Sequence, residues 1–161
     1  MYFINARAII ERFNNEEIEI VIQRRAKHHS SLKFELPGGR INLFEFLTQA
    51  VIREVKEETG LDVFEIEGNE TRVDTKGINS EFEVECLKPF AAYQTIKGPV
   101  DSIGYYFKCK ASGELLEAGD ETVDIQWISI KKLNELFLNN PIDFSDVDRA
   151  GIKYYLKYQG F

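Results

Sequence analysis

Three glutamates at helical spacing, Glu54, Glu57 and Glu58, place three negative charges on one face of a predicted helix. A helix advances about 100° per residue, so positions i, i+3 and i+4 fall within an arc of about 100°. The same face is apolar one to two turns earlier, where it carries Leu47, Ala50 and Val51, with Val55 on its flank. An apolar stripe packs against a core, so the acids emerge at its edge, where their mutual repulsion is poorly screened. The pattern therefore predicts a core-packed helix that holds a divalent cation.

The predicted cation is Mg²⁺, with Mn²⁺ as a substitute. Carboxylates offer only oxygen, which hard cations prefer. No cysteine or histidine accompanies the three acids, which argues against zinc.

The segments that flank this helix fit a working site. Pro37 fixes one backbone angle, and Gly38 and Gly39 let the main chain approach a ligand closely, so this loop is a candidate phosphate site. Gly60 is expected to end the helix in the left-handed conformation.

From Gly39 to Leu61 the chain resembles, without a gap, the box of the Nudix (MutT-type) hydrolases. That box reads Gly, five free positions, Glu, seven free positions, then Arg-Glu-aliphatic-free-Glu-Glu-free-Gly-aliphatic. Its specified places are filled by Gly39, Glu45, Arg53, Glu54, Val55, Glu57, Glu58, Gly60 and Leu61. The resemblance implies an α/β fold, an α/β/α sandwich with a mixed sheet and the box helix packed on it. It also implies hydrolysis of a diphosphate bond in a nucleoside diphosphate linked to another group.

By this resemblance Glu54, Glu57 and Glu58 would be metal ligands. Glu57 or Glu58 would also be the general base, and Glu57 is preferred. Arg53 lies four residues before Glu57 and is expected to pair with it as a supporting residue. Glu45 falls at the helix start and roughly on the opposite side, so we expect it to cap the loop rather than bind the same ion.

A second acidic cluster precedes Trp127 and consists of Glu117, Asp120, Glu121 and Asp124. It resembles the late strand of MutT-type proteins, where a loop acid completes the metal site, and Glu121 is the candidate. The alternative is a solvated turn before a strand.

The sequence indicates the residues that contact the substrate less clearly than it indicates the metal ligands. An arginine at the end of the second strand contacts phosphate in MutT-like chains, which points to Arg25 or Arg24, although an exposed pair is a comparable alternative. The aromatic residues on predicted strands are expected to pack mostly in the core, and one of them is a candidate to stack on a base: Phe90, Tyr93, Tyr105, Tyr106 and Phe107. His28 and His29 are expected to face solvent.

Alternation and turn residues predict the remaining elements. A hairpin is expected over 2–24 with its turn at 14–17, and further strands at about 63–66, 82–87, 90–96, 103–109 and 125–128. Two late helices are expected over about 130–138 and 145–158, the second capped by Asp143 or Ser145. Residues 67–81 have the weakest pattern and are expected to be a loop or an insertion.

Composition fits one domain spanning residues 1–161, with 43% hydrophobic residues to form a core. The formal charge of −7 argues against binding to a nucleic-acid polymer, and no apolar run is long enough to span a bilayer. Cys86 and Cys109 are expected to be buried strand residues. We therefore expect a reducing, cytoplasmic location. A homodimer is expected only because homodimers are the commonest oligomers among soluble proteins.

The sequence indicates a class of substrate but not the individual substrate. The strand end and the loop at 36–39 favour a MutT-like (deoxy)nucleoside triphosphate pyrophosphatase. The alternatives are hydrolysis of ADP-ribose, a nucleotide sugar or a dinucleoside polyphosphate, a nucleotide-binding module without turnover, and a structural ion site. Lys76, Gly77 and Ile78 stand where subfamilies acting on ADP-ribose or dinucleoside polyphosphates carry a diagnostic proline or tyrosine, so neither label transfers.

Overall fold

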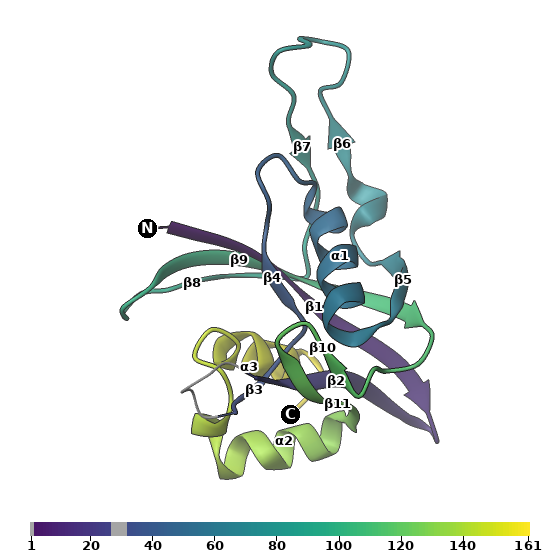
Figure 1. Ribbon diagram of the computed structural model, residues 1–161, viewed down its shortest axis with the longest axis vertical. Helices are drawn as coiled ribbons and strands as arrows, with labels where there is room; N and C mark the ends of the chain where they lie inside the picture. The colour runs from purple at the N-terminus through teal and green to yellow at the C-terminus, as the bar shows by residue number, and fades with distance from the viewer. Residues whose placement is uncertain (1, 27–31) are drawn as a thin grey trace.

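A computed structural model describes residues 2–26 and 32–161, and the predicted positions of His28 and His29 lie outside these ranges. Over these residues the main sheet has nine strands: β1 (Tyr2–Asn14), β2 (Glu17–Arg25), β3 (Phe34–Glu35), β4 (Gly38–Arg40), β5 (Asp62–Ile66), β8 (Ala91–Gln94), β9 (Asp101–Ser112), β10 (Ala118–Gly119) and β11 (Thr122–Ser129). The order along the sheet is β10-β11-β2-β1-β9-β5, with β3 beside β2, β4 beside β1 and β8 beside β9 (Figure 1).

The sheet is mixed because β1 and β9 run parallel, whereas the other paired strands are antiparallel. The predicted N-terminal hairpin is present, with Glu11 opposite Ile20 and the turn residues Asn15 and Glu16 at positive φ. Positive φ at both turn positions gives the twist that suits a tight hairpin.

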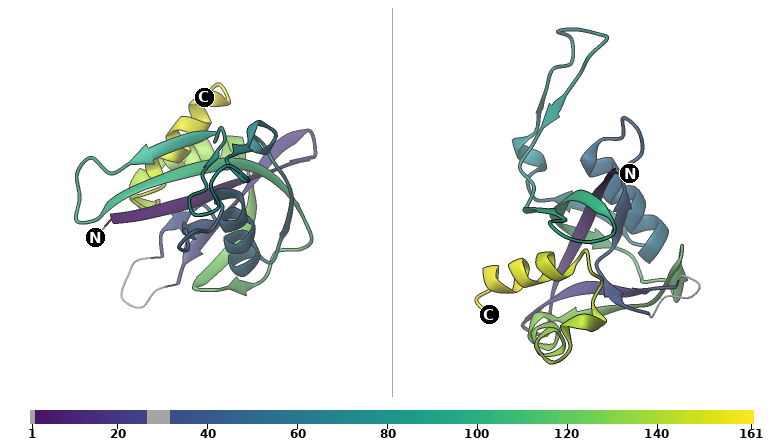
Figure 2. Two further views of the ribbon diagram at one scale, coloured as in Figure 1. Left: turned by 90° about the horizontal axis from the view of Figure 1, so that it is seen from above. Right: turned by 90° about the vertical axis from the view of Figure 1, so that its left-hand side faces the viewer.

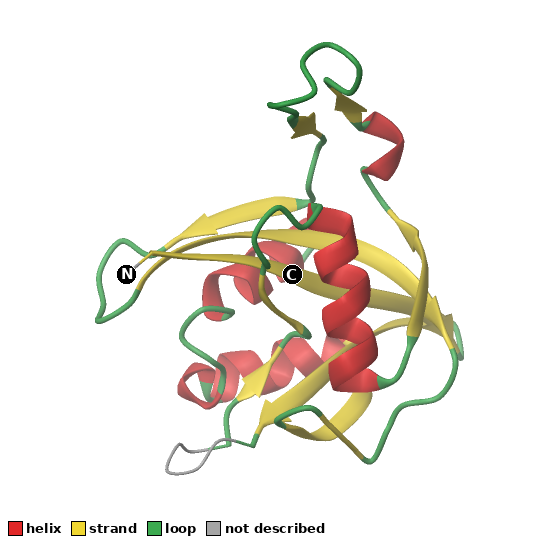
Figure 3. Ribbon diagram, turned by 45° about the horizontal axis from the view of Figure 1, so that its top comes forward, coloured by secondary structure: helices red, strands yellow, loops and turns green. Residues whose placement is uncertain are grey.

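Helices cover both faces of the sheet. On one face, α1 (Leu47–Thr59) packs its Ala50, Val51 and Val55 against a core that contains Ala8 and Ile10 of β1. On the other face, α2 (Ile130–Asn139) and α3 (Arg149–Tyr158) share a core with Ile9 of β1 (Figures 2 and 3). Successive residues of β1 thus serve opposite cores, as the pleat requires. The predicted α/β class, with the box helix packed on a mixed sheet, is confirmed.

Residues 67–87 form an arm that projects from the body of the domain (Figure 1). The arm contains the 3₁₀ turn η1 (Asn69–Thr71) and a small separate sheet of β6 (Val73–Asp74) and β7 (Glu85–Cys86). The strand predicted over 82–87 is thereby reduced to two residues.

Cys86 is exposed, so its predicted burial is wrong, whereas Cys109 is buried in β9 as expected.

The last helix begins later than predicted. A short 3₁₀ turn, η2 (Pro141–Asp143), comes first, and α3 begins at Arg149 with Asp148 at its N-cap. Neither Asp143 nor Ser145 is the N-cap residue, and the buried side chain of Asp148 makes no capping hydrogen bond, because it binds Arg7 and Leu36 N instead. Among the described residues, no helix has the length and apolar character that a bilayer crossing requires.

Candidate functional site

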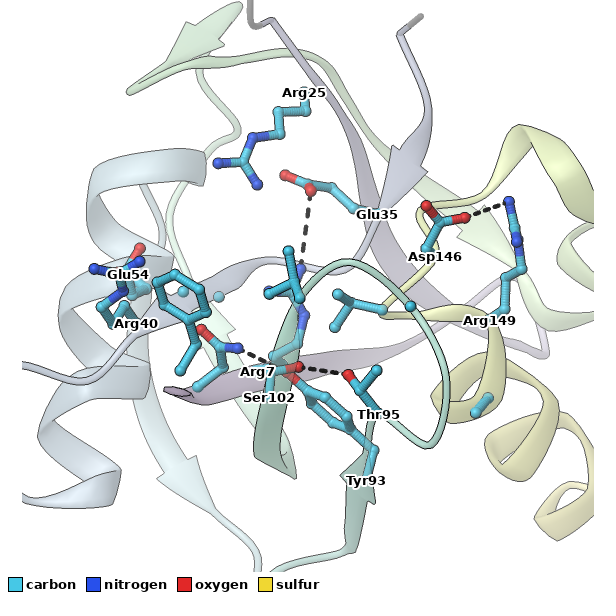
Figure 4. A pocket seen from close by; sticks show the side chains of 18 of the residues that line it. Arg7, Arg25, Glu35, Arg40, Glu54, Tyr93, Thr95, Ser102, Asp146 and Arg149 are labelled. Atoms are coloured by element: carbon cyan, nitrogen blue, oxygen red, sulfur yellow. Dashed lines mark hydrogen bonds and ion pairs between the residues drawn. The ribbon is translucent and has the colours of Figure 1, made fainter. Parts of the chain in front are cut away.

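A cavity of about 970 Å³ opens beside the acidic end of α1. Its walls are β4, the loop 94–100 between β8 and β9, the turn 120–122 between β10 and β11, and residues 146–150 before and at the start of α3 (Figure 4). Of the residues singled out in the sequence for catalysis or binding, it brings together Arg25, Gly38, Gly39, Glu54, Glu57, Glu58 and Glu121. Arg24, Glu45 and Arg53 do not line it.

Glu54 lies against the main chain of Gly39. A Cβ atom on Gly39 would lie only 2.8 Å from the Glu54 carboxylate carbon, so the missing side chain leaves this carboxylate its place. Arg53 Nη1 donates to Glu54 Oε1 at 2.6 Å. Glu54 is therefore held at the cavity wall by a neighbouring cation.

Glu58 is buried, and three groups fix it. The amide of Gln23 donates to Oε2, Gly38 N donates to Oε1 at 3.3 Å, and the Thr122 hydroxyl donates to the Glu58 main-chain carbonyl at 2.9 Å. Burial raises the pKa of Glu58 to about 9, and Glu35 adds to the rise whereas Arg7 opposes it. Without a bound cation, burial therefore disfavours the ionised form of this carboxyl group.

Glu57 is the most accessible of the three box acids, with 44% of its side chain exposed against 14% for Glu54. Its main-chain carbonyl accepts a hydrogen bond from Asp120 N at 3.0 Å, which joins the end of α1 to the turn 120–122. Glu57 thus combines a fixed main chain with a side chain that solvent can reach.

Arg53 makes the ion pair with Glu57 that spacing along the helix predicted, but its shortest bonds go to other acids. Its distance to Glu57 Oε2 is 3.5 Å, whereas Nε and Nη2 donate to the two oxygens of Glu45 at 2.7 and 2.9 Å. Glu45 lies in the loop before α1, as expected, and also accepts from Asn42 N at 2.9 Å. The hydrogen bonds from Arg53 lower the pKa of Glu45.

The turn 120–122 carries part of the second acidic cluster. Asp120 and Glu121 line the cavity, and the Glu121 carbonyl accepts from Ala26 N at 2.8 Å. Asp124 instead pairs with Arg24 at 3.0 Å, and Glu117 is exposed. The cluster is therefore divided, with only its middle members at the site.

The donor set fits a hard divalent cation such as Mg²⁺, because Glu54, Glu57 and Glu58 present oxygen alone and Gly39 leaves room for the first of them. Across residues 2–26 and 32–161, no three acidic, histidine or cysteine side chains are already gathered around one point. Binding therefore requires side-chain rotation, most simply by Glu57, whose carboxylate is the least constrained.

Only one of the two predicted arginines faces the cavity. Arg25 lines it (Figure 4), whereas Arg24 lies over the ring of Phe34 at 3.7 Å and donates to the Leu32 carbonyl at 2.5 Å. Residues alternate along a strand, so Arg24 and Arg25 point to opposite sides of β2.

Sequence reasoning missed Arg7. It lines the cavity yet is only 6% exposed, and its Nη2 donates to the Leu36 carbonyl at 2.6 Å and to Asp148 Oδ2 at 2.8 Å. The signal was present, because an arginine interrupts the apolar run of β1 at 6–10 and must have a buried partner.

Among the five strand aromatics, Tyr93 lines the cavity, and its hydroxyl accepts from Asn5 Nδ2 at 2.7 Å. Tyr106 and Phe107 are buried in the two cores, as expected for most of the set. Phe90 packs edge-on against aromatic rings of α3.

Comparison with known proteins identifies the family of this chain. The NUDIX domain family model matches residues 1–146. A segment of 63 residues is 41% identical to a putative nudix hydrolase 1 of Caenorhabditis elegans, and one of 48 residues is 50% identical to the 8-oxo-dGTP diphosphatase of Escherichia coli. These segments make up 38% and 29% of this chain, but only 17% and 37% of the two relatives.

Solved structures share the fold at low sequence identity. MutT from Aliivibrio salmonicida and Vibrio cholerae aligns over 98% of this chain and 99% of its own, with a TM-score of 0.64 and 19% identity. The NUDIX domain of Shewanella oneidensis NrtR, complexed with ADP ribose, aligns over 99% of this chain and 89% of its own, with a TM-score of 0.63 and 14% identity. With the family model covering most of its length and its box acids on one cavity wall, the chain belongs to the Nudix family.

Proposed function

We propose that this chain is a Mg²⁺-dependent hydrolase of phosphoric anhydrides, acting as a MutT-like pyrophosphohydrolase of (deoxy)nucleoside triphosphates. One observation carries the proposal: the carboxylates of Glu54, Glu57 and Glu58 share a cavity with the main chain of Gly38 and the guanidinium of Arg25. The acids suit a divalent cation, the Gly38 amide donates to one of them, and the guanidinium suits phosphate oxygens.

Glu54, Glu57 and Glu58 would hold the cation, with Glu121 facing them from the opposite turn. When bound, the cation would offset phosphate charge and make a nearby water more acidic. Arg25 attracts the substrate phosphates and orients them. Glu57 accepts a proton from the attacking water, because it is the most accessible of the three acids. Arg53 acts through Glu54, since it does not reach the cavity.

The nucleoside triphosphate class is supported by the identity with the 8-oxo-dGTP diphosphatase of E. coli over 48 residues. A second candidate is a longer substrate such as ADP-ribose. A cavity of about 970 Å³ lies at the upper end of the range for small-molecule sites, which is about 300–1,000 Å³. The loop 94–100 forms part of the wall of that cavity.

The test is a turnover assay of the purified chain with Mg²⁺ or Mn²⁺. The panel contains nucleoside triphosphates, nucleotide sugars, ADP-ribose and dinucleoside polyphosphates, at neutral to mildly alkaline pH. We expect release of a nucleoside monophosphate and pyrophosphate from at least one triphosphate. Performing the reaction in ¹⁸O-labelled water identifies the attacked phosphorus, because only the product that received the water oxygen gains mass. Cleavage of ADP-ribose alone would favour the second candidate, and no cleavage at all would favour a nucleotide-binding module.

A further inference from the structure

Gln23 is fully buried in β2, and its side chain lies between two buried acids. The amide nitrogen donates to Glu35 Oε1 at 3.2 Å and also to Glu58 Oε2. An amide nitrogen carries two hydrogens, so one donor group serves both carboxyl groups. Gln23 therefore links Glu58 to the strand β3 that carries Glu35.

Stability of the core alone does not explain a buried glutamine at position 23. The Oε1 atom of Gln23 is buried without a hydrogen-bond partner among the described residues, and such an orphan acceptor is costly. An apolar side chain of the same length would avoid that cost. The presence of an amide at this position is explained if its two hydrogens are needed to bind Glu35 and Glu58.

Glu35 is itself anchored. Arg7 Nη2 lies 3.9 Å from Glu35 Oε2 (Figure 4). Arg7 is in turn held by the fully buried Asp148. The acceptor on the far side of Gln23 is thus fixed by a buried ion pair between β1 and the start of α3. Because Glu35 accepts from Gln23 and pairs with Arg7, the Gln23 amide has a defined position from which to hold Glu58.

We propose that Gln23 is a positioning residue that sets the affinity of the metal site by fixing the orientation of Glu58. This inference rests on the proposed function only in taking Glu58 as a ligand of the divalent cation. Hydrogen-bond partners of metal ligands typically change metal affinity by about 10- to 100-fold when they are removed. Gln23 acts through Glu58, because it does not line the cavity.

The test measures Mn²⁺ binding by electron paramagnetic resonance, which detects free Mn²⁺ and needs no turnover. We expect Gln23→Met, which keeps the length but removes both donors, to raise the Mn²⁺ dissociation constant at least about 10-fold. Gln23→Asn keeps an amide but is too short to span both acids, so it should weaken binding as well. It also serves as the second variant if Gln23→Met does not fold.

Two further variants separate positioning from general stability. Tyr155→Phe removes a partly buried hydrogen bond to Glu11 from a tyrosine of the core on the α3 side of the sheet, and should leave Mn²⁺ affinity unchanged even if the melting temperature falls. In a Glu58→Gln background, Gln23→Met should cause little further loss of affinity, because the two residues act through one ligand.

Activity gives an independent readout once a substrate is known. The Mg²⁺ concentration for half-maximal activity should rise in Gln23→Met, whereas the turnover number at saturating Mg²⁺ should change less than about threefold. Unchanged Mn²⁺ affinity in a folded Gln23→Met protein would overturn the inference, as would absence of Mn²⁺ binding by the parent chain. Mn²⁺ binding that depends on Gln23 without any turnover would uphold it while refuting the proposed function.

Discussion

Arg53 and Glu45 form a two-pronged ion pair, in which Nε and Nη2 of the arginine donate to the two carboxylate oxygens at 2.7 and 2.9 Å. The same guanidinium donates to Glu54 at 2.6 Å and to the Arg40 carbonyl at 3.1 Å. One side chain thus joins the middle of α1, the loop before it, the end of β4 and a candidate metal ligand. This geometry needs a planar fork, which arginine alone provides.

Arg53→Lys should therefore lower the turnover number at least about 10-fold while the fold is retained, because lysine keeps the charge but cannot hold Glu45 and Glu54 together. Steady-state kinetics and circular dichroism measure the two effects. The matched control is Arg72→Lys, since Arg72 makes similar bonds to Asp74 and Glu85 at the base of the arm, outside the cavity. Equal losses in both variants would contradict a specific role for Arg53.

Local rules predicted the box helix well, but they found only one of the partners of Arg53. The start, the apolar stripe and the left-handed end at Gly60 depend on residues close in sequence. The i,i+4 rule correctly pairs Arg53 with Glu57, at 3.5 Å, but it does not find Glu45, which the fold of the preceding loop brings closer, at 2.7 Å. The geometry of the loop decides which acid lies nearest to Arg53, and helical periodicity carries no information about that geometry.

The other features that the sequence did not predict all depend on contacts between segments that are distant in the chain. Arg7 and Asp148 are separated by 141 residues, so no local pattern links them. Cys86 lies on a strand whose neighbour, β6, belongs to the arm, and a separate two-stranded sheet offers no core to bury it. The role of Gln23 also depends on Glu35 and Glu58 meeting from different elements.

The two glycines of the loop should respond differently to alanine. Gly39→Ala is expected to leave thermal stability nearly unchanged, because the atom nearest the new Cβ belongs to the movable end of Glu54, 2.8 Å away. It should weaken Mn²⁺ binding and activity, because Glu54 must leave its place. Gly38→Ala should destabilise the fold, since φ is +145° there and the new Cβ would lie 2.5 Å from the Ala6 carbonyl oxygen. Calorimetry and Mn²⁺ titration of both variants measure this contrast, which the reverse order of stabilities would refute.

Glu57→Gln should lower the turnover number at least about 100-fold, because the amide neither accepts the proton of the attacking water nor ligates a cation strongly. Its melting temperature without metal should stay the same or rise, since one charge of the acidic cluster is removed. Glu135→Gln, on the exposed face of α2, is the control with the same chemical change away from the cavity. Full activity in Glu57→Gln would remove Glu57 from the mechanism and leave Glu58 as the candidate base.

The stability of the metal-free protein should fall as pH rises. Burial raises the pKa of Glu58 from 4.5 to about 9, so between these values the folded chain binds a proton that the unfolded chain does not. Unfolding then releases that proton, and the free energy of unfolding falls by at most about 1.4 kcal/mol per pH unit from this group. Urea denaturation with a chelator at pH 6 and pH 8.5 measures the difference.

Glu58→Gln should reduce this pH dependence, and the part that remains reflects other groups, among them Glu35, whose pKa burial also raises. Glu65→Gln, an exposed residue paired with Lys110, should keep the parent's pH dependence. Mg²⁺ affinity should show the opposite trend and increase with pH, because the cation competes with the proton on Glu58. A Glu58→Gln protein with the full pH dependence would show that this carboxyl group is already ionised in the folded chain.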